Sequence, residues 1–150
     1  MIILKPNGYV YNSIDEPTDD NWNKVTSIIK LDNNFSKEAL IGLNEFSHVE
    51  IFFHFHKLDD SKICTAARHL RNNKSFPKVD VFAQRGKNRP NKIGAAICKL
   101  IKVEDMSLEI NGLDAINGTP VLDIKPVFRE YQPQNVEQPA WVSELMKDYF

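Results

Sequence analysis

The sequence predicts a mainly β fold in which one antiparallel sheet curls or closes on itself. Two observations lead to this prediction. Short runs rich in β-branched and aromatic residues recur along the chain, and turn residues separate them. Few segments have helical periodicity, and those that do are short. Strands that follow one another through turns favour antiparallel pairing, and curling buries one face of the sheet.

The expected strands follow from residue type and alternation. They cover residues 8–12, 25–31, 47–55, 79–83, 93–101, 108–113 and 121–124. Residues 47–55 form the clearest of them, because Val49, Ile51 and Phe53 alternate with polar residues. This alternation places His54 and His56 on the same outer face. Two such histidines can be half of a metal site, but no third ligand has a suitable spacing, so we expect no metal.

Three segments are expected to form short helices. Residues 36–43 have Ser36 as an N-cap and Gly42 near the end. Residues 60–69 have moderate helical spacing of apolar side chains. Residues 137–150 resemble an amphipathic helix whose inward side chains are Trp141, Leu145 and Phe150.

Length and composition indicate one domain over residues 1–150. No apolar run approaches the roughly 18 residues of a membrane span, and the N-terminus lacks the pattern of a signal peptide. The two cysteines, Cys64 and Cys98, have no metal-site spacing and are expected to be reduced thiols in a cytoplasmic protein.

Charge is unevenly distributed along the chain. Residues 57–102 hold twelve lysines and arginines against three acids, a local charge of +9, while the whole chain has a net charge of −1. Such segregation can create a positive face that suits an anionic partner such as RNA. The alternative is a solvated loop between acidic ends, and the charge pattern by itself does not decide between them.

The segment 82–94 is the most unusual part of the sequence. It joins two strand-like runs, and residues 84–92 between them hold four cations, two asparagines, a glycine and a proline. A hairpin that only reverses the chain needs about two to five residues, whereas this connection has about nine. We therefore expect a hairpin loop that holds a ligand.

Three sequence blocks resemble one known family. The first reads Gly-Leu-x-x-Phe-Ser-His at residues 42–48 and continues to Phe-x-Phe-His at 53–56. The second reads Phe-Ala-x-Arg at 82–85, followed by Arg-Pro-Asn-x-Ile-Gly at 89–94. The third reads Gly-Thr-Pro-Val-Leu-Asp-Ile-Lys-Pro at 118–126, after Gly-Leu-Asp at 112–114. Together they are similar to the TsaA-like family of tRNA adenine N6-methyltransferases.

The resemblance implies a fold, an activity and partners. It implies a small single-sheet β-barrel with short helices, unlike the Rossmann fold of many methyltransferases. It implies a homodimer that uses S-adenosylmethionine to methylate N6 of the threonylcarbamoyl-adenosine beside the tRNA anticodon. Two alternatives stay open: a methyltransferase of a small molecule, and a non-enzymatic barrel that binds the cofactor or RNA.

The resemblance also implies site residues. The cofactor-binding residues would be His56, Lys57, Arg85, Ala95, Leu113, Asp114, Ala115 and Ile116. Arg85 offers a guanidinium fork for a carboxylate or paired hydroxyls. Asp114 can accept from a hydroxyl or an ammonium, and either Asp114 or His56 would collect the proton released by methylation.

Other residues near these blocks have two interpretations. Arg89 either shapes its loop or contacts RNA, while Lys87 and Lys92 are expected to face solvent and contact phosphates if RNA is the substrate. The family's N-terminal Pro-Arg-Gln element has no counterpart in the acidic residues 15–22, where Asp20 or Trp22 is expected to replace it.

Overall fold

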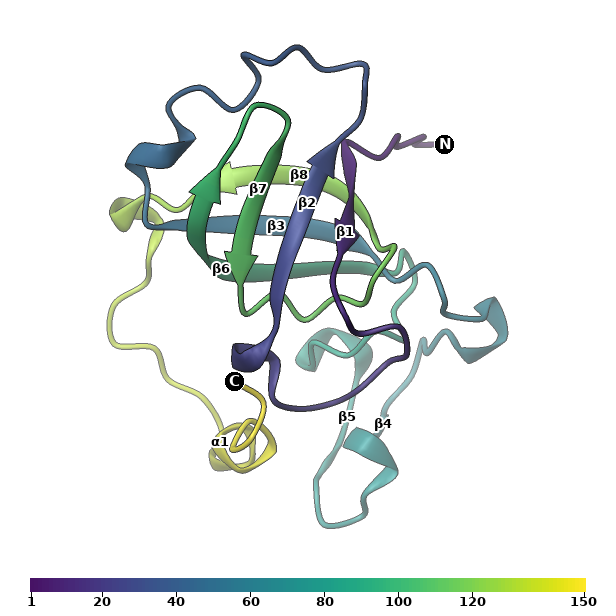
Figure 1. Cartoon of the computed structure of the whole chain (residues 1–150). Coiled ribbons are helices and arrows are strands. Elements are labelled where there is room, and N and C mark those ends of the chain that lie inside the picture. Colours follow the sequence, from purple (N-terminus) through teal and green to yellow (C-terminus); the bar gives the residue numbers. More distant parts are fainter.

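The computed structural model describes all 150 residues and contains a closed antiparallel barrel (Figure 1). Its strands are β1 Gly8–Tyr11, β2 Thr26–Leu31, β3 His48–His54, β6 Ile93–Val103, β7 Ser107–Asn111 and β8 Pro120–Pro126. They are hydrogen-bonded in the order β1-β2-β7-β6-β3-β8, and β8 pairs with β1 to close the barrel. The predicted antiparallel, closing sheet is therefore confirmed.

The barrel core consists mainly of inward-facing side chains at alternating positions along the six barrel strands. On β3, Val49, Ile51 and Phe53 are buried, whereas the residues between them are only partly covered. Strand β2 alternates in the same way, with Ser27 and Ile29 fully buried. Because neighbouring side chains on a strand point to opposite faces, this periodicity follows directly from the sequence.

A glycine allows close packing between β3 and β6. Gly94 pairs with Phe53 across the two strands. A Cβ at position 94 would lie 2.5 Å from the Phe53 ring. The absent side chain therefore leaves room for the Phe53 ring, which packs edge-on against Phe55 with centroids 5.3 Å apart.

The connection between β3 and β6 differs from the prediction. It contains a separate two-stranded sheet, β4 Arg68–His69 with β5 Lys78–Val79. It also holds three 3-10 turns: η3 Asp60–Lys62, η4 Leu70–Asn72 and η5 Val81–Ala83. The predicted helix at 60–69 and the predicted strand at 79–83 are therefore wrong, apart from Val79, which lies in β5. The loop at 84–92 does not close a hairpin, because β6 pairs with β3 and β7 rather than with β5. Asp59 and Asp80, the N-caps of η3 and η5, each cap only a single turn.

The helix predicted at residues 36–43 is also wrong. The Ser36 hydroxyl does accept from the Glu38 N–H at 3.3 Å. However, the backbone then forms successive turns in which each N–H bonds the carbonyl three residues earlier, and Gly42 adopts φ +88°. The left-handed conformation of Gly42 ends the turns, and the short 3-10 helix η2 Leu43–Glu45 follows.

The C-terminal segment forms a shorter helix than expected, α1 Ala140–Leu145. Trp141 and Leu145 are half-buried as predicted, but Phe150 is 55% exposed, so its inward placement is wrong. The chain returns to the barrel through backbone bonds to the start of η1 Trp22–Lys24: Asn21 N–H donates to Asp148 O, and Trp22 N–H to Tyr149 O, both at 2.8 Å. Another 3-10 turn, η6 Arg129–Tyr131, precedes this segment.

No helix has the length and apolar character that crossing a membrane requires.

Candidate functional site

The connection between β7 and β8 lies at one end of the barrel, where the β4–β5 sheet and α1 also lie (Figure 1). Leu113, Ala115 and Ile116 turn their side chains inward and are buried. Asn12 secures this connection, because its side-chain amide donates to Ala115 O at 2.8 Å and to the Ser27 hydroxyl at 2.9 Å. Three of the predicted cofactor residues therefore present mainly backbone to a ligand.

Asp114 is the ionisable side chain of this connection. Its Oδ2 accepts a hydrogen bond from the Tyr149 hydroxyl. Its Oδ1 is buried and has no hydrogen-bond partner. Burial raises the pKa of the Asp114 carboxyl, and the Tyr149 hydroxyl and the Arg85 charge oppose that rise. An acceptor left unpaired in this way is a place where a ligand donor would fit.

Arg85 joins the loop at residues 84–92 to the barrel. Its guanidinium donates to Ala95 O, in β6, at 2.7 Å. Its charge also acts on Asp114 and on Tyr149. The structure thus brings three predicted residues, Arg85, Ala95 and Asp114, to the same region.

His56 and Lys57 reach the β7–β8 connection from the end of β3. A Cβ added to Gly118 would lie 3.8 Å from the His56 Nε2 atom, which places that ring against the connection. Lys57 Nζ donates to Asp15 O at 2.8 Å, and the Asp15 carboxylate accepts from the Asn117 amide at 3.1 Å. Burial and the Lys57 charge lower the pKa of the His56 imidazole, so it is neutral near pH 7.

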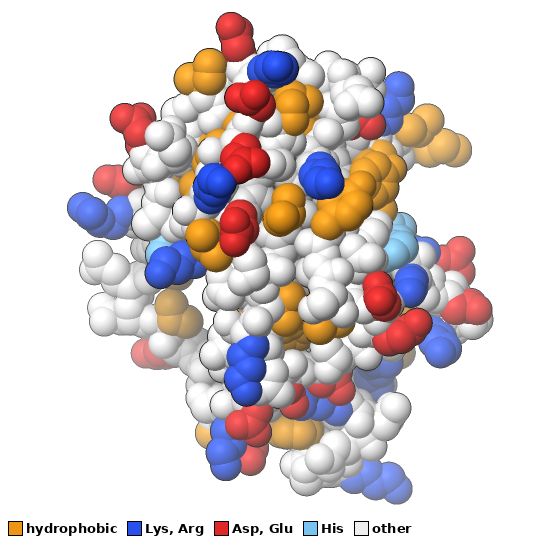
Figure 2. Space-filling model, viewed as in Figure 1, with side chains coloured by type: hydrophobic (Ala, Val, Ile, Leu, Met, Phe, Trp, Pro, Cys, Tyr) orange, Lys and Arg blue, Asp and Glu red, His pale blue; other side chains and the backbone are white.

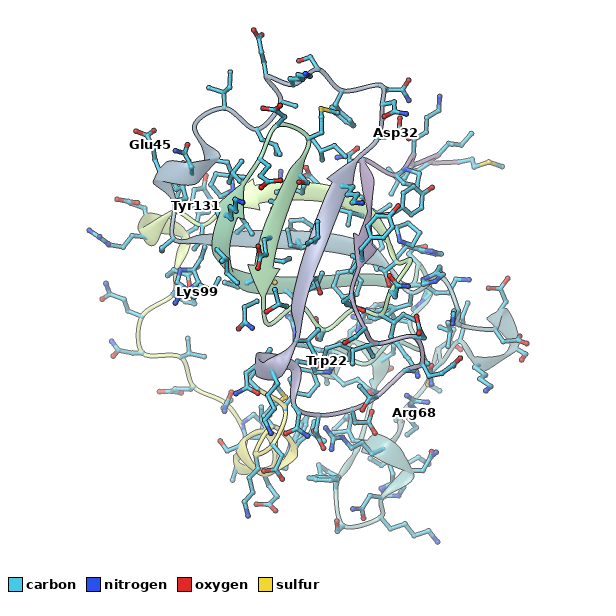
Figure 3. All side chains as sticks on the ribbon, viewed as in Figure 1. Trp22, Asp32, Glu45, Arg68, Lys99 and Tyr131 are labelled. Atoms are coloured by element: carbon cyan, nitrogen blue, oxygen red, sulfur yellow. The ribbon has the colours of Figure 1, made fainter.

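The acidic N-terminal segment packs on the same end of the barrel. Asp20 forms a two-pronged ion pair with Arg71, with N–O distances of 2.9 and 3.3 Å. The Trp22 side chain is 3% exposed and lies where the C-terminal segment returns (Figure 3). The Asp20 carboxylate therefore has a protein partner and the Trp22 side chain is buried, and the predicted replacement of the family's N-terminal element by either residue stays a prediction.

Sequence reasoning missed Tyr149 as a member of this group. Its hydroxyl reaches a carboxylate 35 positions earlier in the chain. Burial and the Asp114 charge raise the pKa of the Tyr149 phenol, which therefore stays a proton donor. The amphipathic pattern of the last residues indicated Phe150 as the inward aromatic, and no motif surrounds Tyr149 that would have marked it.

The predicted RNA-contacting cations differ in their surroundings. The Arg89 guanidinium donates to Gln84 O at 3.0 Å and to Gly86 O at 3.2 Å, so it holds its own loop together. Lys92 pairs with Asp60 at 2.6 Å and its side chain is 18% exposed, so the expectation that Lys92 faces solvent is wrong. Lys87 is exposed, as expected.

His54 and His56 do not belong to a metal-binding cluster. The structure holds no group of three or more His, Cys, Asp or Glu side chains placed to bind a metal ion. His54 instead lines a groove of about 540 Å³ between the N-terminal segment and the outside of the barrel. Asn91 and Ile93 also line this groove, but none of the predicted cofactor residues does.

Comparison with known proteins identifies the family. The family model of the tRNA-methyltransferase O N-terminal domain matches residues 11–132. A tRNA (adenine(37)-N6)-methyltransferase of Homo sapiens is 45% identical over 107 residues, which are 71% of this chain and 24% of the human protein. A probable S-adenosyl-L-methionine-binding protein of Pyrococcus abyssi is 28% identical over 149 residues, 96% of this chain and 78% of that protein.

The barrel itself is similar to solved structures. A crystal structure of TrmO from Pseudomonas aeruginosa superposes with a TM-score of 0.76 at 28% identity, covering 94% of this chain and 62% of that one. The chain spans only about a quarter of the mammalian relatives it matches. The matched region includes all three sequence blocks, and the chain belongs to the family of the tRNA-methyltransferase O N-terminal domain.

Proposed function

We propose that this chain binds S-adenosylmethionine and transfers its methyl group to N6 of an adenosine in tRNA, the threonylcarbamoyl-adenosine beside the anticodon. The names of the human and Pyrococcus relatives support the activity and the cofactor. The observation that carries the proposal is the convergence of the three sequence blocks on the β7–β8 connection, through His56, Arg85 and Asp114.

The donors and acceptors of the site fit this cofactor. S-adenosylmethionine carries an ammonium and two ribose hydroxyls, any of which can donate to the unpaired Oδ1 of Asp114. It also carries a carboxylate, which suits Arg85, since the bond to Ala95 O occupies only part of the guanidinium fork. Leu113, Ala115 and Ile116 would hold the adenosine by their backbone, because their side chains are committed to the core.

The reaction asks for positioning more than for chemistry from the protein. When bound, the cofactor supplies a methyl group already activated by the sulfonium. The residues of this chain must hold the acceptor amine in line and exclude water. We infer that His56 takes the N6 proton. Its neutral imidazole has an unprotonated ring nitrogen that can accept a proton, whereas the Asp114 carboxylate is engaged by the Tyr149 hydroxyl.

The basic connection between β3 and β6 supports RNA as the acceptor. Four of its lysines are exposed and form no ion pair in the structure: Lys62, Lys74, Lys78 and Lys87. Exposed cations on the side of the barrel that holds the site would contact phosphates. Arg89 and Lys92 would contribute through the shape of the loop and through charge.

Titration calorimetry with S-adenosylmethionine tests the cofactor. Arg85→Ala should weaken binding at least about 10-fold, the scale of one charge-assisted hydrogen bond. Arg129→Ala is the matched control, because Arg129 lies in η6 and outside the site. Protein freed of co-purified cofactor that shows no binding heat would remove the proposal.

The acceptor needs separate measurements. Methylated adenosine should appear by mass spectrometry of tRNA from a strain lacking this gene, after incubation with protein and cofactor. Affinity for tRNA should fall by orders of magnitude between about 50 and 200 mM salt. If the protein binds the cofactor, binds tRNA in a salt-insensitive way and yields no methylated tRNA, a small-molecule acceptor is favoured. If it binds the cofactor or RNA and yields no methylated product of any kind, a non-enzymatic barrel is favoured.

We also propose a homodimer in the cytoplasm. The outer face of β6 exposes Ile93, Ile97 and Ile101, at 38%, 48% and 49%. Apolar side chains also gather over β1 and β2 (Figure 2). An apolar stripe of this kind suits association with a second copy. Both cysteines are free thiols, which suits a reducing compartment.

A further inference from the structure

We propose that Tyr149 is a positioning residue of the cofactor site, whose hydroxyl holds the Asp114 carboxylate so that Oδ1 remains available to a donor of the ligand. The inference rests on the proposed function and extends it to a part of the chain not yet assigned to it. Tyr149 lies outside residues 11–132, which the family model covers. The C-terminal segment would then be one wall of the site.

The two carboxylate oxygens of Asp114 have different surroundings. Oδ2 accepts from the Tyr149 hydroxyl, while Oδ1 is buried and has no partner. A carboxylate accepts several hydrogen bonds, and an unpaired buried oxygen raises the free energy of the folded protein. Fixing Oδ2 determines the rotation of the carboxylate and thereby the position of Oδ1. A ligand that donates to Oδ1 therefore finds its acceptor already oriented.

The backbone holds Tyr149 independently of Asp114. Trp22 N–H donates to Tyr149 O, and Asn21 N–H to Asp148 O. The Tyr149 ring also packs edge-on against Phe150 with centroids 4.8 Å apart. Trp22 is itself buried, so the segment is anchored to the body of the protein rather than to the carboxylate alone. This anchoring is what a positioning residue requires.

The charges around Asp114 decide its protonation. The Tyr149 hydroxyl faces it from the C-terminal segment, Arg85 from the loop and the Cys98 thiol from β6. Tyr149 and Arg85 lower the pKa of Asp114 against the effect of burial. Burial and the Asp114 charge raise the pKa of Cys98 to about 12, so the thiol is neutral. Loss of the Tyr149 hydroxyl would leave only the backbone N–H of Asp114 and the Arg85 charge to oppose burial, so the Asp114 carboxyl would take up a proton at higher pH.

Calorimetry of S-adenosylmethionine binding to the full chain between pH 5 and pH 8 tests the inference. Tyr149→Phe should bind about 10-fold more weakly at pH 7, and its affinity should begin to fall at higher pH than in the wild type. Tyr131→Phe is the control, because Tyr131 is 82% exposed and lies in η6, outside the site. In an Asp114→Asn background, Tyr149→Phe should add little further loss, since it acts through Asp114.

A second readout needs no ligand. The carboxyl carbon of Asp114, followed by carbon NMR with labelled aspartate and assigned by Asp114→Asn, should titrate at higher pH in Tyr149→Phe. Thermal melting should show that the variant is folded. Unchanged affinity together with an unchanged Asp114 titration overturns the inference, and so does tighter binding, which would mean that the segment obstructs the site. A wild-type protein that binds no S-adenosylmethionine at any pH removes the proposed function instead, and the Asp114 titration distinguishes the two failures.

Discussion

Asp114 is an ionisable side chain placed where burial opposes its charge. Burial raises the pKa of its carboxyl above the ordinary value of 3.8, and no protein group satisfies Oδ1. In the pH range between the ordinary pKa of Asp114 in the unfolded chain and its raised pKa in the folded protein, the folded protein therefore binds the Asp114 proton more tightly. Stability gained from protonating Asp114 increases as the pH falls through that range and is absent at neutral pH.

Replacement of Asp114 by asparagine should separate stability from binding. At pH 7 the variant should be more stable than the wild type by about 1 kcal/mol, because no charge is buried. This difference should shrink as the pH falls toward 4, because burial makes the wild-type carboxyl take up a proton at higher pH than in the unfolded chain. Urea unfolding at both pH values measures it, with Asp123→Asn, at an exposed ion pair, as the control. A variant less stable than the wild type at pH 7 would contradict this account.

His56 has the opposite linkage. Burial, Lys57 and His54 lower the pKa of its imidazole, so the folded protein resists protonation that the unfolded chain accepts near pH 6.5. Stability from this residue is present above pH 6.5 and is lost as the pH falls toward the lowered pKa. His56→Gln should therefore lose less stability than the wild type between pH 7 and pH 5. Chemical unfolding at several pH values measures this difference. If the free energy of unfolding of the variant and of the wild type changes equally with pH, His56 is solvated.

At the scale of elements, the β3–β6 pair connects the core to the site. Phe53 fills the barrel opposite Gly94, and the neighbouring Ala95 carbonyl accepts from Arg85. A shift of β6 relative to β3 would therefore disturb both the core and the position of Arg85. The close packing of the Phe53 ring over a glycine keeps this register.

Gly94→Ala should destabilise the barrel by about 1–3 kcal/mol, because the new methyl group would overlap the Phe53 ring. Gly86→Ala is the matched control, since a Cβ there would meet the end of the Gln84 side chain at 3.2 Å, which can move aside. Denaturant midpoints of the two variants and the wild type provide the comparison. Equal midpoints for Gly94→Ala and Gly86→Ala would mean that Phe53 adjusts without cost.

At the scale of the whole molecule, the distribution of side chains separates two surfaces. The end of the barrel with the β7–β8 connection combines the site with the basic β3–β6 connection, where Arg68 lies (Figure 3). The outside of β6 carries the exposed isoleucines. One surface is therefore suited to an anionic acceptor and the other to a second protein chain.

Ile97→Asp should convert the proposed dimer into a monomer, because Ile97 is 48% exposed in the middle of the β6 stripe and a buried aspartate would lack a partner. Sedimentation velocity at several concentrations measures the mass. Ile28→Asp, on β2 and 40% exposed, tests whether the interface lies on β6 or over β1 and β2. A wild-type protein that sediments as a monomer would remove the dimer.

The sequence by itself determined the strands of the barrel and the family. Alternation along residues 47–55 and 25–31 reports which face is buried, and three blocks in order are enough to identify the relatives. Only the tertiary structure decided how residues 36–43 and 60–69 fold, that Lys92 pairs with Asp60, and that Tyr149 rather than Phe150 turns inward. The physical reason is range: side-chain alternation is a property of neighbouring residues, whereas these other features depend on contacts with residues elsewhere in the chain.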